Sequence, residues 1–399
     1  MSRRELGAAL AALAGGARHL AATPAIDDTL RDGVAQRKIP AAVGMAAGAG
    51  KILYSGACGT RDPSGVPVTI DSIFAIASKN KAVTTVAALQ LVEQGKVTLD
   101  EPVSRLLPQL ADPKVLDGFD RATGKPVLRA ARTPITLKHL LTHTSGLCYD
   151  TWDADMFRYT QSVGPSAFAA AVPPLMFEPG TRWQYGTGVD FAGRLVEAIS
   201  GMSLEEYFQA KILRPLGMAD TSYILPDSKF DRLVTGYQRQ PDGSLKPNAR
   251  KMPAAPRQFN GGGGLYSTAG DYVRFMQMIL HKGEGILRPK TIESMEVNQI
   301  GAATAGKMKS YRPDSSADVD IQPGASEKWG LGFLINTTPY EGGRSAGSLA
   351  WAGLFNTFFW IDPRRSRCAV LLMQFLPFVD KEAVGLLGDF ERAVYGNLS

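Results

Sequence analysis

The chain of 399 residues is 44% hydrophobic and 21% charged, which is typical of a folded globular protein and excludes a disordered or fibrous one. Its formal net charge is +6, but no basic block alternates with aromatic residues, so the composition does not indicate nucleic-acid binding. Three cysteines, Cys58, Cys148 and Cys368, stand at no spacing typical of a metal site or a disulfide framework. The length suffices for two or three domains or for one large two-lobed body.

Residues 1–24 form an N-terminal extension with some features of an export signal. Ser-Arg-Arg-Glu-Leu after Met1 resembles a twin-arginine start, and an apolar run extends to Ala17. The run is too short to span a membrane, so we expect no stable membrane insertion. Because Arg18, His19 and Pro24 crowd the region where cleavage would occur, we expect a cytoplasmic protein, with export to the periplasm as the alternative.

The next part of the chain predicts one helix and a pair of strands. Residues 25–37 have the apolar spacing of an amphipathic helix, which ends near Pro40. Residues 41–47 and 52–58 are β-like and are separated by a glycine-rich turn at 48–51, which predicts a hairpin.

Residues 72–95 are the most informative stretch, because an apolar approach leads into Ser78 and the pattern then becomes helical. Apolar residues lie almost all round this helix, which predicts that it is buried. Gly95 follows the last turn and can adopt the left-handed conformation that ends a helix. Ser78 and Lys81 therefore share one face of the first turn, with side-chain roots about 5–6 Å apart.

This Ser-x-x-Lys, the only one in the chain, suggests a nucleophile and its base. Burial and the positive end of the helix dipole both favour a neutral amine, so we expect a neutral Lys81 to remove the proton from Ser78. The plainer interpretation makes Ser78 a helix cap and Lys81 a solvated side chain. The apolar character of the helix favours the first interpretation, and Lys79 points elsewhere.

Two histidines raise the question of a metal site. Thr136 is the predicted cap of a short helix that carries His139 and His143, four residues apart on one face. Leucines stand where a zinc-protease helix needs its glutamate, and no third ligand is apparent. We therefore expect no metal, and histidines that bond to backbone groups beneath a loop.

A second informative stretch is the glycine-rich loop at 180–188, which carries Tyr185 ahead of a helix closed by Gly201. Working side chains commonly lie on irregular segments held by a rigid element, so Tyr185 is a candidate catalytic residue. The alternative is a packed tyrosine with one hydrogen bond. Ser203 and Glu206 predict a capping box for the next helix.

The remaining elements complete the chain. The run Gly261 to Gly264 lacks the features of a phosphate-binding loop or dinucleotide fingerprint, so we expect it to approach a cleft and to bind no cofactor. Residues 301–328 are polar without a period and are predicted to be an exposed excursion. The expected later elements are a helix at 272–281 started by Thr268 and Asp271, antiparallel strands at 329–337, 349–361 and 368–375, and a final helix at 381–395.

A hairpin near the start, helices in the middle and strands near the end imply a discontinuous architecture. We expect an α+β fold, an α/β sandwich in which an antiparallel sheet from both chain ends is covered by helices. Residues 25–77 and 227–399 would form this α/β domain, and residues 78–226 a mostly helical domain inserted into it. The cleft would lie between them.

A rival nucleophile is Ser345, because residues 343–347 fit the Gly-x-Ser-x-Gly elbow. That elbow needs a helix after the serine and a triad histidine further along the chain. The segment that follows is strand-like, and the last histidine is His281, so we predict that Ser345 lies in a turn. The basic run 364–367 predicts another solvated turn, with nucleic acid or lipid contact as the less favoured alternative.

Taken together, several motifs occur in the order seen in the serine β-lactamase-like superfamily: Ser78-Lys79-Asn80-Lys81, His143 to Leu147, Tyr185, Gly261 to Leu265, and Trp351-Ala352-Gly353. The chain most resembles the family VIII carboxylesterases, which are similar to class C β-lactamases, and the related fungal acyltransferase that attaches the statin side chain. The likeness covers nearly everything after about residue 25. It implies a β-lactamase/transpeptidase-like fold and an enzyme without metal or cofactor.

The resemblance also implies roles for individual residues. Ser78 would be the acylated nucleophile, Lys81 its base, and Tyr185 the residue that relays a proton to the leaving group. The backbone N–H groups of Ser78 and Leu354 would form the oxyanion hole.

The sequence departs from the family pattern at two places. Thr187 stands where the tyrosine motif normally ends in asparagine. Trp351 replaces the lysine of the lactamase Lys-Thr-Gly, so the cation that would hold a β-lactam carboxylate is missing. Trp351 and Gly353 would contact substrate, and uncharged esters become likelier substrates than penicillins.

We therefore expect a serine carboxylesterase that hydrolyses short- to medium-chain esters through an acyl-enzyme on Ser78. The alternatives are an acyltransferase with an alcohol acceptor and a weak class C-type β-lactamase. A hypothesis from another class is a non-catalytic penicillin- or peptide-binding module. The expected partner is a small-molecule ester, and the sequence does not specify an oligomeric state.

Overall fold

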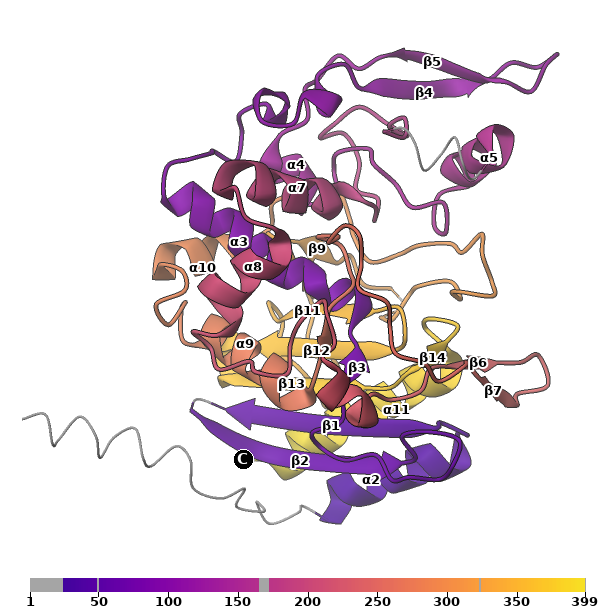
Figure 1. Ribbon diagram of the computed structural model, residues 1–399, viewed down its shortest axis with the longest axis vertical. Helices are drawn as coiled ribbons and strands as arrows, with labels where there is room; N and C mark the ends of the chain where they lie inside the picture. Colours follow the sequence, from indigo (N-terminus) through magenta and orange to yellow (C-terminus); the bar gives the residue numbers. More distant parts are fainter. Residues whose placement is uncertain (1–23, 49, 165–171, 323, 399) are drawn as a thin grey trace, which may run out of the picture.

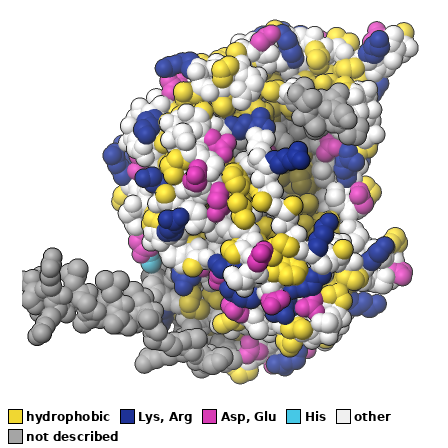
Figure 2. All heavy atoms as spheres, in the orientation of Figure 1, with side chains coloured by type: hydrophobic (Ala, Val, Ile, Leu, Met, Phe, Trp, Pro, Cys, Tyr) yellow, Lys and Arg dark blue, Asp and Glu magenta, His cyan; other side chains and the backbone are white. Residues whose placement is uncertain are grey.

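The computed structural model describes residues 24–48, 50–164, 172–322 and 324–398 (Figure 1). The signal-like segment at the start of the chain lies outside these ranges, apart from Pro24, which begins a helix. Within them, no helix combines the length and apolar character needed to cross a membrane. Basic and acidic side chains are interspersed over the face shown in Figure 2, as the dispersed charges of the sequence suggest.

A seven-stranded antiparallel sheet confirms that both chain ends contribute to one sheet. Its strand order is β2-β1-β13-β12-β11-β10-β9. The pairing of β1 with β13 joins the two ends, with Val43 opposite Leu372. The strands are β1 (Ala41–Gly48), β2 (Lys51–Gly59), β9 (Lys328–Trp329), β10 (Leu334–Ile335), β11 (Leu349–Gly353), β12 (Thr357–Asp362) and β13 (Arg367–Leu372).

The sheet is covered on both faces because its central strands are apolar on both sides. Alternate residues of a strand point to opposite faces. Val43 and Met45 belong to the core that includes α9 (Ala269–Leu280), whereas Ala42 and Ala46 pack with α2 (Pro24–Gln36) and α11 (Lys381–Asn397). The predicted α/β sandwich is therefore correct.

The middle of the chain forms a second region around the buried helix α3 (Asn80–Glu93), which packs against α7 (Gly188–Ser200). Gly95 and Gly201 both have left-handed backbones, at φ 69° and 68°, and end these helices as predicted. The hairpin of β4 (Lys114–Phe119) and β5 (Pro126–Ala130) was not predicted, because these strands are short and β5 has no buried residue, so their pattern is weak (Figure 1). The other elements here are α4 (Leu137–Leu141), α5 (Ala154–Val163) and α8 (Leu204–Phe208).

Several short elements complete the molecule. Among them, β3 pairs with β8 just before Ser78, and β14 pairs with β6. The short elements are β3 (Phe74–Ala75), β6 (Tyr237–Arg239), β7 (Leu245–Pro247), β8 (Tyr266–Ser267), α10 (Pro289–Met295) and β14 (Phe375–Leu376).

Two predicted segments differ from the structure in ways that affect the site. The run 349–361 is not one strand, because a turn at 354–356 separates β11 from β12, with Asn356 at φ 59°. The segment 301–328 is not simply an exposed excursion. Ser316 is fully buried, and the backbone N–H of Ala317 donates to the carbonyl of Phe378 at 2.9 Å, so this segment is folded against the body of the protein.

Candidate active site

Ser78 lies in a single 3-10 turn, Ala77–Lys79, that leads directly into α3. Ala77 has φ 45°, a left-handed conformation that costs a residue other than glycine on the order of 1–3 kcal/mol. Such strain persists only where the surrounding structure imposes it. Here it bends the chain between β3 and α3, and Ser78 remains half-buried at the wall of a cavity.

Lys81 is buried one turn beyond Ser78, and its amine has three hydrogen-bond partners. The Nζ atom lies 3.1 Å from Ser78 Oγ, 3.2 Å from Tyr149 OH and 2.7 Å from the carbonyl oxygen of Gly262. An ammonium group has three N–H donors, and a carbonyl oxygen can only accept. Three partners around one amine therefore suit the charged form.

The electrostatic surroundings of Lys81 lead to the same conclusion. Burial lowers the pKa of Lys81, but the acidic groups packed around it, Tyr149, Tyr185 and Asp190, raise that pKa above its ordinary value. The raised pKa opposes the expected neutral Lys81. The groups that raise it come from elements other than the helix, so the pattern around Ser78 does not reveal them.

Tyr149 is a site residue that sequence reasoning missed. It comes two positions after the His143-to-Leu147 motif, and this proximity was the signal available in the sequence. Burial raises the pKa of Tyr149 despite the opposing charge of Lys81, so its phenol keeps its proton at neutral pH. Tyr149 thus adds a second tyrosine to the predicted pair of Lys81 and Tyr185.

Tyr185 is placed close to Lys81 by the loop that precedes α7. Its side chain is 2% exposed, and Lys81 Nζ lies 4.9 Å from the centre of its ring. Its hydroxyl accepts a hydrogen bond from Trp351 Nε1 at 3.2 Å. The structure therefore brings Ser78, Lys81, Tyr185 and Trp351 together from three separate parts of the chain.

The glycine run Gly261 to Gly264 forms the backbone wall beside Lys81, as predicted. Asn80 Nδ2 donates to the carbonyl of Gly261 at 2.7 Å, and the N–H of Gly262 donates to Asp190 Oδ1 at 2.8 Å. A side chain at Gly261 would collide with the carbonyl oxygen of Val189. Glycine at position 261 therefore lets the backbone pass close to α7, where the carbonyl of Gly262 reaches Lys81.

The strand β11 passes directly beside the backbone that leads to Ser78. A Cβ atom at Gly353 would collide with the carbonyl oxygen of Ile76, so glycine is required for this approach. The turn after β11 puts Leu354 in the same cavity wall as Ser78. Leu354 and Gly353 are therefore beside the serine, where the sequence predicted them.

The cavity at Ser78 has a volume of about 480 Å³, and none of the described residues that line it is charged. Ser315, from the segment predicted to be exposed, contributes to its wall. The lining residues are Ala75, Ala77, Ser78, Tyr149, Thr151, Trp152, Gly262, Gly263, Gly264, Leu265, Tyr266, Ser315, Leu354 and Phe355. Such a lining suits an uncharged, partly apolar group.

The other candidates lie outside this arrangement. His139 Nδ1 accepts from the N–H of Thr136 at 3.3 Å, and His143 Nδ1 accepts from the N–H of Gly186 at 3.4 Å. Burial, assisted by the charge of Lys81, lowers the pKa of His143 far enough to keep it neutral. Ser345 lines a different cavity, and no cluster of metal-ligating side chains occurs among the residues that the structure describes.

The fold is that of the serine β-lactamase-like class of proteins. Residues 26–389 match the family described as Beta-lactamase, and the chain belongs to this family. The resemblance seen in the sequence is thereby confirmed.

Individual relatives are similar over almost their whole length. Monacolin J acid methylbutanoyltransferase of Aspergillus terreus is 33% identical, over 94% of this chain and 96% of the relative. Lovastatin esterase of Penicillium rubens is 30% identical, over 94% and 98%. A mutant simvastatin synthase from Aspergillus terreus superposes with a TM-score of 0.81 at 32% identity, over 93% of this chain and 94% of the other. The family and these relatives support an enzyme that hydrolyses or transfers acyl groups.

Proposed function

We propose that the protein is a serine carboxylesterase of the family VIII type, which cleaves uncharged short- to medium-chain esters through an acyl-enzyme on Ser78. The observation that carries the proposal is the 3.1 Å contact between Ser78 Oγ and Lys81 Nζ, at the wall of a cavity whose described lining residues are all uncharged. The acyl group occupies that cavity, and neither a metal nor a cofactor takes part.

The reaction begins when the deprotonated fraction of Lys81 removes the proton from Ser78. Ser78 Oγ then attacks the ester carbonyl, and the N–H groups of Ser78 and Leu354 donate to the oxyanion that forms. Tyr185 relays a proton to the departing alcohol, with its hydroxyl held by Trp351 Nε1. Water then attacks the acyl-enzyme, which releases the acid and restores Ser78.

Trp351 and Gly353 contribute to substrate choice in this proposal. Gly353 keeps β11 close to Ser78, and Trp351 supplies an apolar indole where a β-lactamase would present a cation. Weak β-lactamase activity is therefore a minor alternative. A non-catalytic penicillin- or peptide-binding module is the alternative from another class.

Acyl transfer to an alcohol is a second candidate, because similar proteins carry the names methylbutanoyltransferase and simvastatin synthase. The acyl-enzyme is the same in both reactions. An alcohol replaces water in the second step, and the product is a new ester. The name of lovastatin esterase favours hydrolysis on the same fold.

A fluorophosphonate probe tests the proposal directly, because it phosphonylates only an activated serine. We expect labelling at Ser78, located by mass spectrometry of the digested protein, and none in Ser78→Ala. The matched control is Ser345→Ala, which should label like the unmodified protein. If the folded protein is not labelled, the proposal of an enzyme fails and the non-catalytic binding module becomes the preferred hypothesis. Incubating the active enzyme with p-nitrophenyl butyrate and excess alcohol then distinguishes free acid from a transferred ester.

A further inference from the structure

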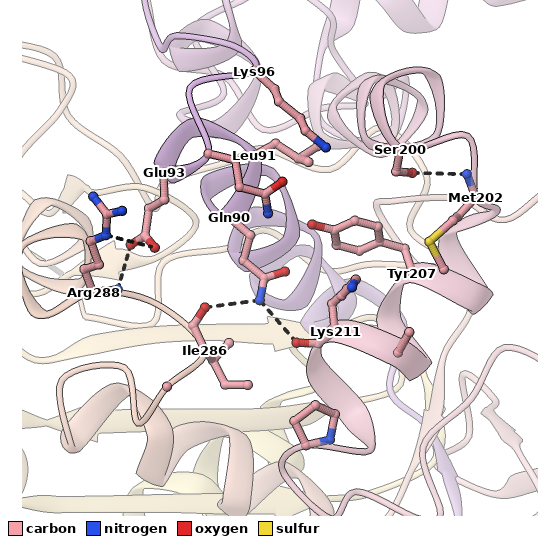
Figure 3. Close-up of a pocket in the computed structure, with 14 residues that line it drawn as sticks. Gln90, Leu91, Glu93, Lys96, Ser200, Met202, Tyr207, Lys211, Ile286 and Arg288 are labelled. Carbon is pink, nitrogen blue, oxygen red and sulfur yellow. Dashed lines mark hydrogen bonds and ion pairs between the residues drawn. The ribbon is translucent and has the colours of Figure 1, made fainter.

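A second cavity, of about 610 Å³, lies at the end of α3 opposite to Ser78 (Figure 3). Gln90 and Leu91 contribute from α3, Tyr207 from α8, and Ile286 from the loop before α10. Helix α3 has 14 residues and rises about 1.5 Å per residue, which puts roughly 20 Å between this cavity and Ser78. The two cavities share no lining residue. We call this second cavity the distal pocket.

The wall of the distal pocket is held rigidly. Gln90 Nε2 donates to the carbonyl oxygens of Lys211 at 3.2 Å and Ile286 at 3.1 Å, which ties three separate segments together (Figure 3). The cavity is therefore preformed, which reduces the cost of binding a ligand.

The phenol of Tyr207 is an unpartnered polar group in this wall. The side chain is 2% exposed, and its hydroxyl has no hydrogen-bond partner of standard geometry within the described part of the chain, although the side chain of Gln94 approaches it. Burial raises the pKa of Tyr207 to about 12, although the neighbouring Gln94 opposes the shift, so the phenol remains an O–H donor at neutral pH. A buried donor without an acceptor destabilises the protein, and a ligand that accepts its proton would recover part of that cost.

The charges around the distal pocket do not cancel. Glu93 is already engaged by Arg288, through the backbone N–H at 2.6 Å and the guanidinium at 3.9 Å. Lys96 and Lys211 are exposed, and neither belongs to an ion pair among the described residues. In Figure 3 their amines extend from opposite sides toward Tyr207. Two ammonium groups and a phenol therefore offer hydrogen-bond donors, and the complementary group is an anion.

Apolar side chains of Leu91, Met202, Pro215 and Ile286 line the rest of the cavity. A bare inorganic anion would leave this surface without a partner, whereas a carboxylate with a hydrocarbon body would cover it. We propose that the distal pocket binds an organic carboxylate, whose charged end lies between Lys96 and Lys211 and whose hydrocarbon part contacts the apolar wall.

The acid released by ester hydrolysis belongs to the same chemical class. That link rests on the proposed function, whereas the binding site itself does not. The test therefore measures binding, on full-length protein with Ser78 replaced by alanine, so that turnover plays no part.

Isothermal titration calorimetry with octanoate and with the neutral octanamide tests the site. We expect octanoate to bind at least about tenfold more tightly than octanamide, the effect of one charge-assisted hydrogen bond. The double variant Lys96→Gln/Lys211→Gln should lose that preference. A matched double variant of exposed lysines elsewhere, Lys51→Gln/Lys125→Gln, should keep it.

Tyr207→Phe distinguishes a ligand contact from a structural role. Removing an unpartnered hydroxyl should leave the midpoint of urea unfolding unchanged or higher, while octanoate affinity falls severalfold. Equal affinity for octanoate and octanamide, an unchanged preference in the Lys96/Lys211 variant, or tight binding of inorganic phosphate in competition with octanoate would each overturn the proposal.

Discussion

Lys79, the residue next to Ser78, is a buried lysine that the proposed chemistry does not use, and its replacement by methionine gives a quantitative test of the structure. Its side chain is fully buried, and Nζ has no hydrogen-bond partner among the described residues. The amine lies 3.9 Å from the centre of the Tyr272 ring. Burial lowers the pKa of Lys79 well below its ordinary value of 10.5. Methionine is unbranched and of similar length, so it can fill the same space.

The lowered pKa determines how stability depends on pH. Below pH 10.5, Lys79 is protonated in the unfolded chain. In the folded protein it stays neutral until the pH falls to its lowered pKa. Unfolding then takes up one proton, so the free energy of unfolding rises with pH by about 1.4 kcal/mol per unit within that window. Lys79→Met lacks this contribution. The variant should therefore be more stable, and its advantage should grow as the pH falls from 10.

Urea unfolding of the unmodified protein and Lys79→Met at pH 7, 8 and 9 measures this effect, with the exposed Lys125→Met as control. We expect the stability advantage of Lys79→Met to grow as the pH falls, by up to about 1.4 kcal/mol per pH unit, and the difference for Lys125→Met to stay constant. Hydrolysis of p-nitrophenyl butyrate should persist in both. Parallel pH curves, or a variant that is less stable throughout, would mean that Lys79 stays protonated over the Tyr272 ring, and the reasoning would fail.

Three further predictions concern the active site. Since the pKa of Lys81 is raised, log kcat/KM should increase by about one per pH unit through the neutral range. Lys81→Arg should be nearly inactive, because guanidinium stays protonated. A flat pH profile or an active Lys81→Arg variant would exclude Lys81 as the base. Tyr149→Phe removes an acceptor from the Lys81 ammonium, so the kcat/KM profile should shift to lower pH; an unchanged profile would contradict this role. Uncharged p-nitrophenyl butyrate should be cleaved far faster than nitrocefin. Trp351→Lys should raise nitrocefin turnover by about ten- to a hundredfold, which is the effect of one charge-assisted hydrogen bond. Values of kcat/KM for butyrate and nitrocefin in a ratio near one in the unmodified enzyme would favour a lactamase.

The overall architecture could be predicted because it depends on long apolar patterns. The buried helix after Ser78, the N-terminal hairpin and the C-terminal strands each carry a strong local signal, and glycines at Gly95 and Gly201 mark helix ends with their left-handed backbones. The hairpin β4–β5 and the break between β11 and β12 carry no such signal. The break depends on Asn356, whose side chain donates to the carbonyl oxygens of Phe375 and Pro377 at 2.9 and 2.8 Å.

The contact between Ser78 and Lys81 could be predicted from the sequence, but the groups that surround it could be predicted only in part. Ser78 and Lys81 are close in sequence, so their contact follows from helix geometry. The charge state of Lys81 depends on Tyr149 and Asp190, which approach from other parts of the chain and leave no local pattern. The wall formed by Ser315 was missed for the same reason, because its segment is polar and owes its position to contacts with Phe378.

The central claim is that Ser78 is the nucleophile. The most direct measurement compares the initial rates of p-nitrophenyl butyrate hydrolysis by the unmodified protein, Ser78→Ala and Ser345→Ala, after circular dichroism shows that all three are folded. We expect Ser78→Ala to reduce kcat/KM to background and Ser345→Ala to retain most of the activity. Retained activity in Ser78→Ala together with its loss in Ser345→Ala would contradict the account and transfer the catalytic role to the second serine.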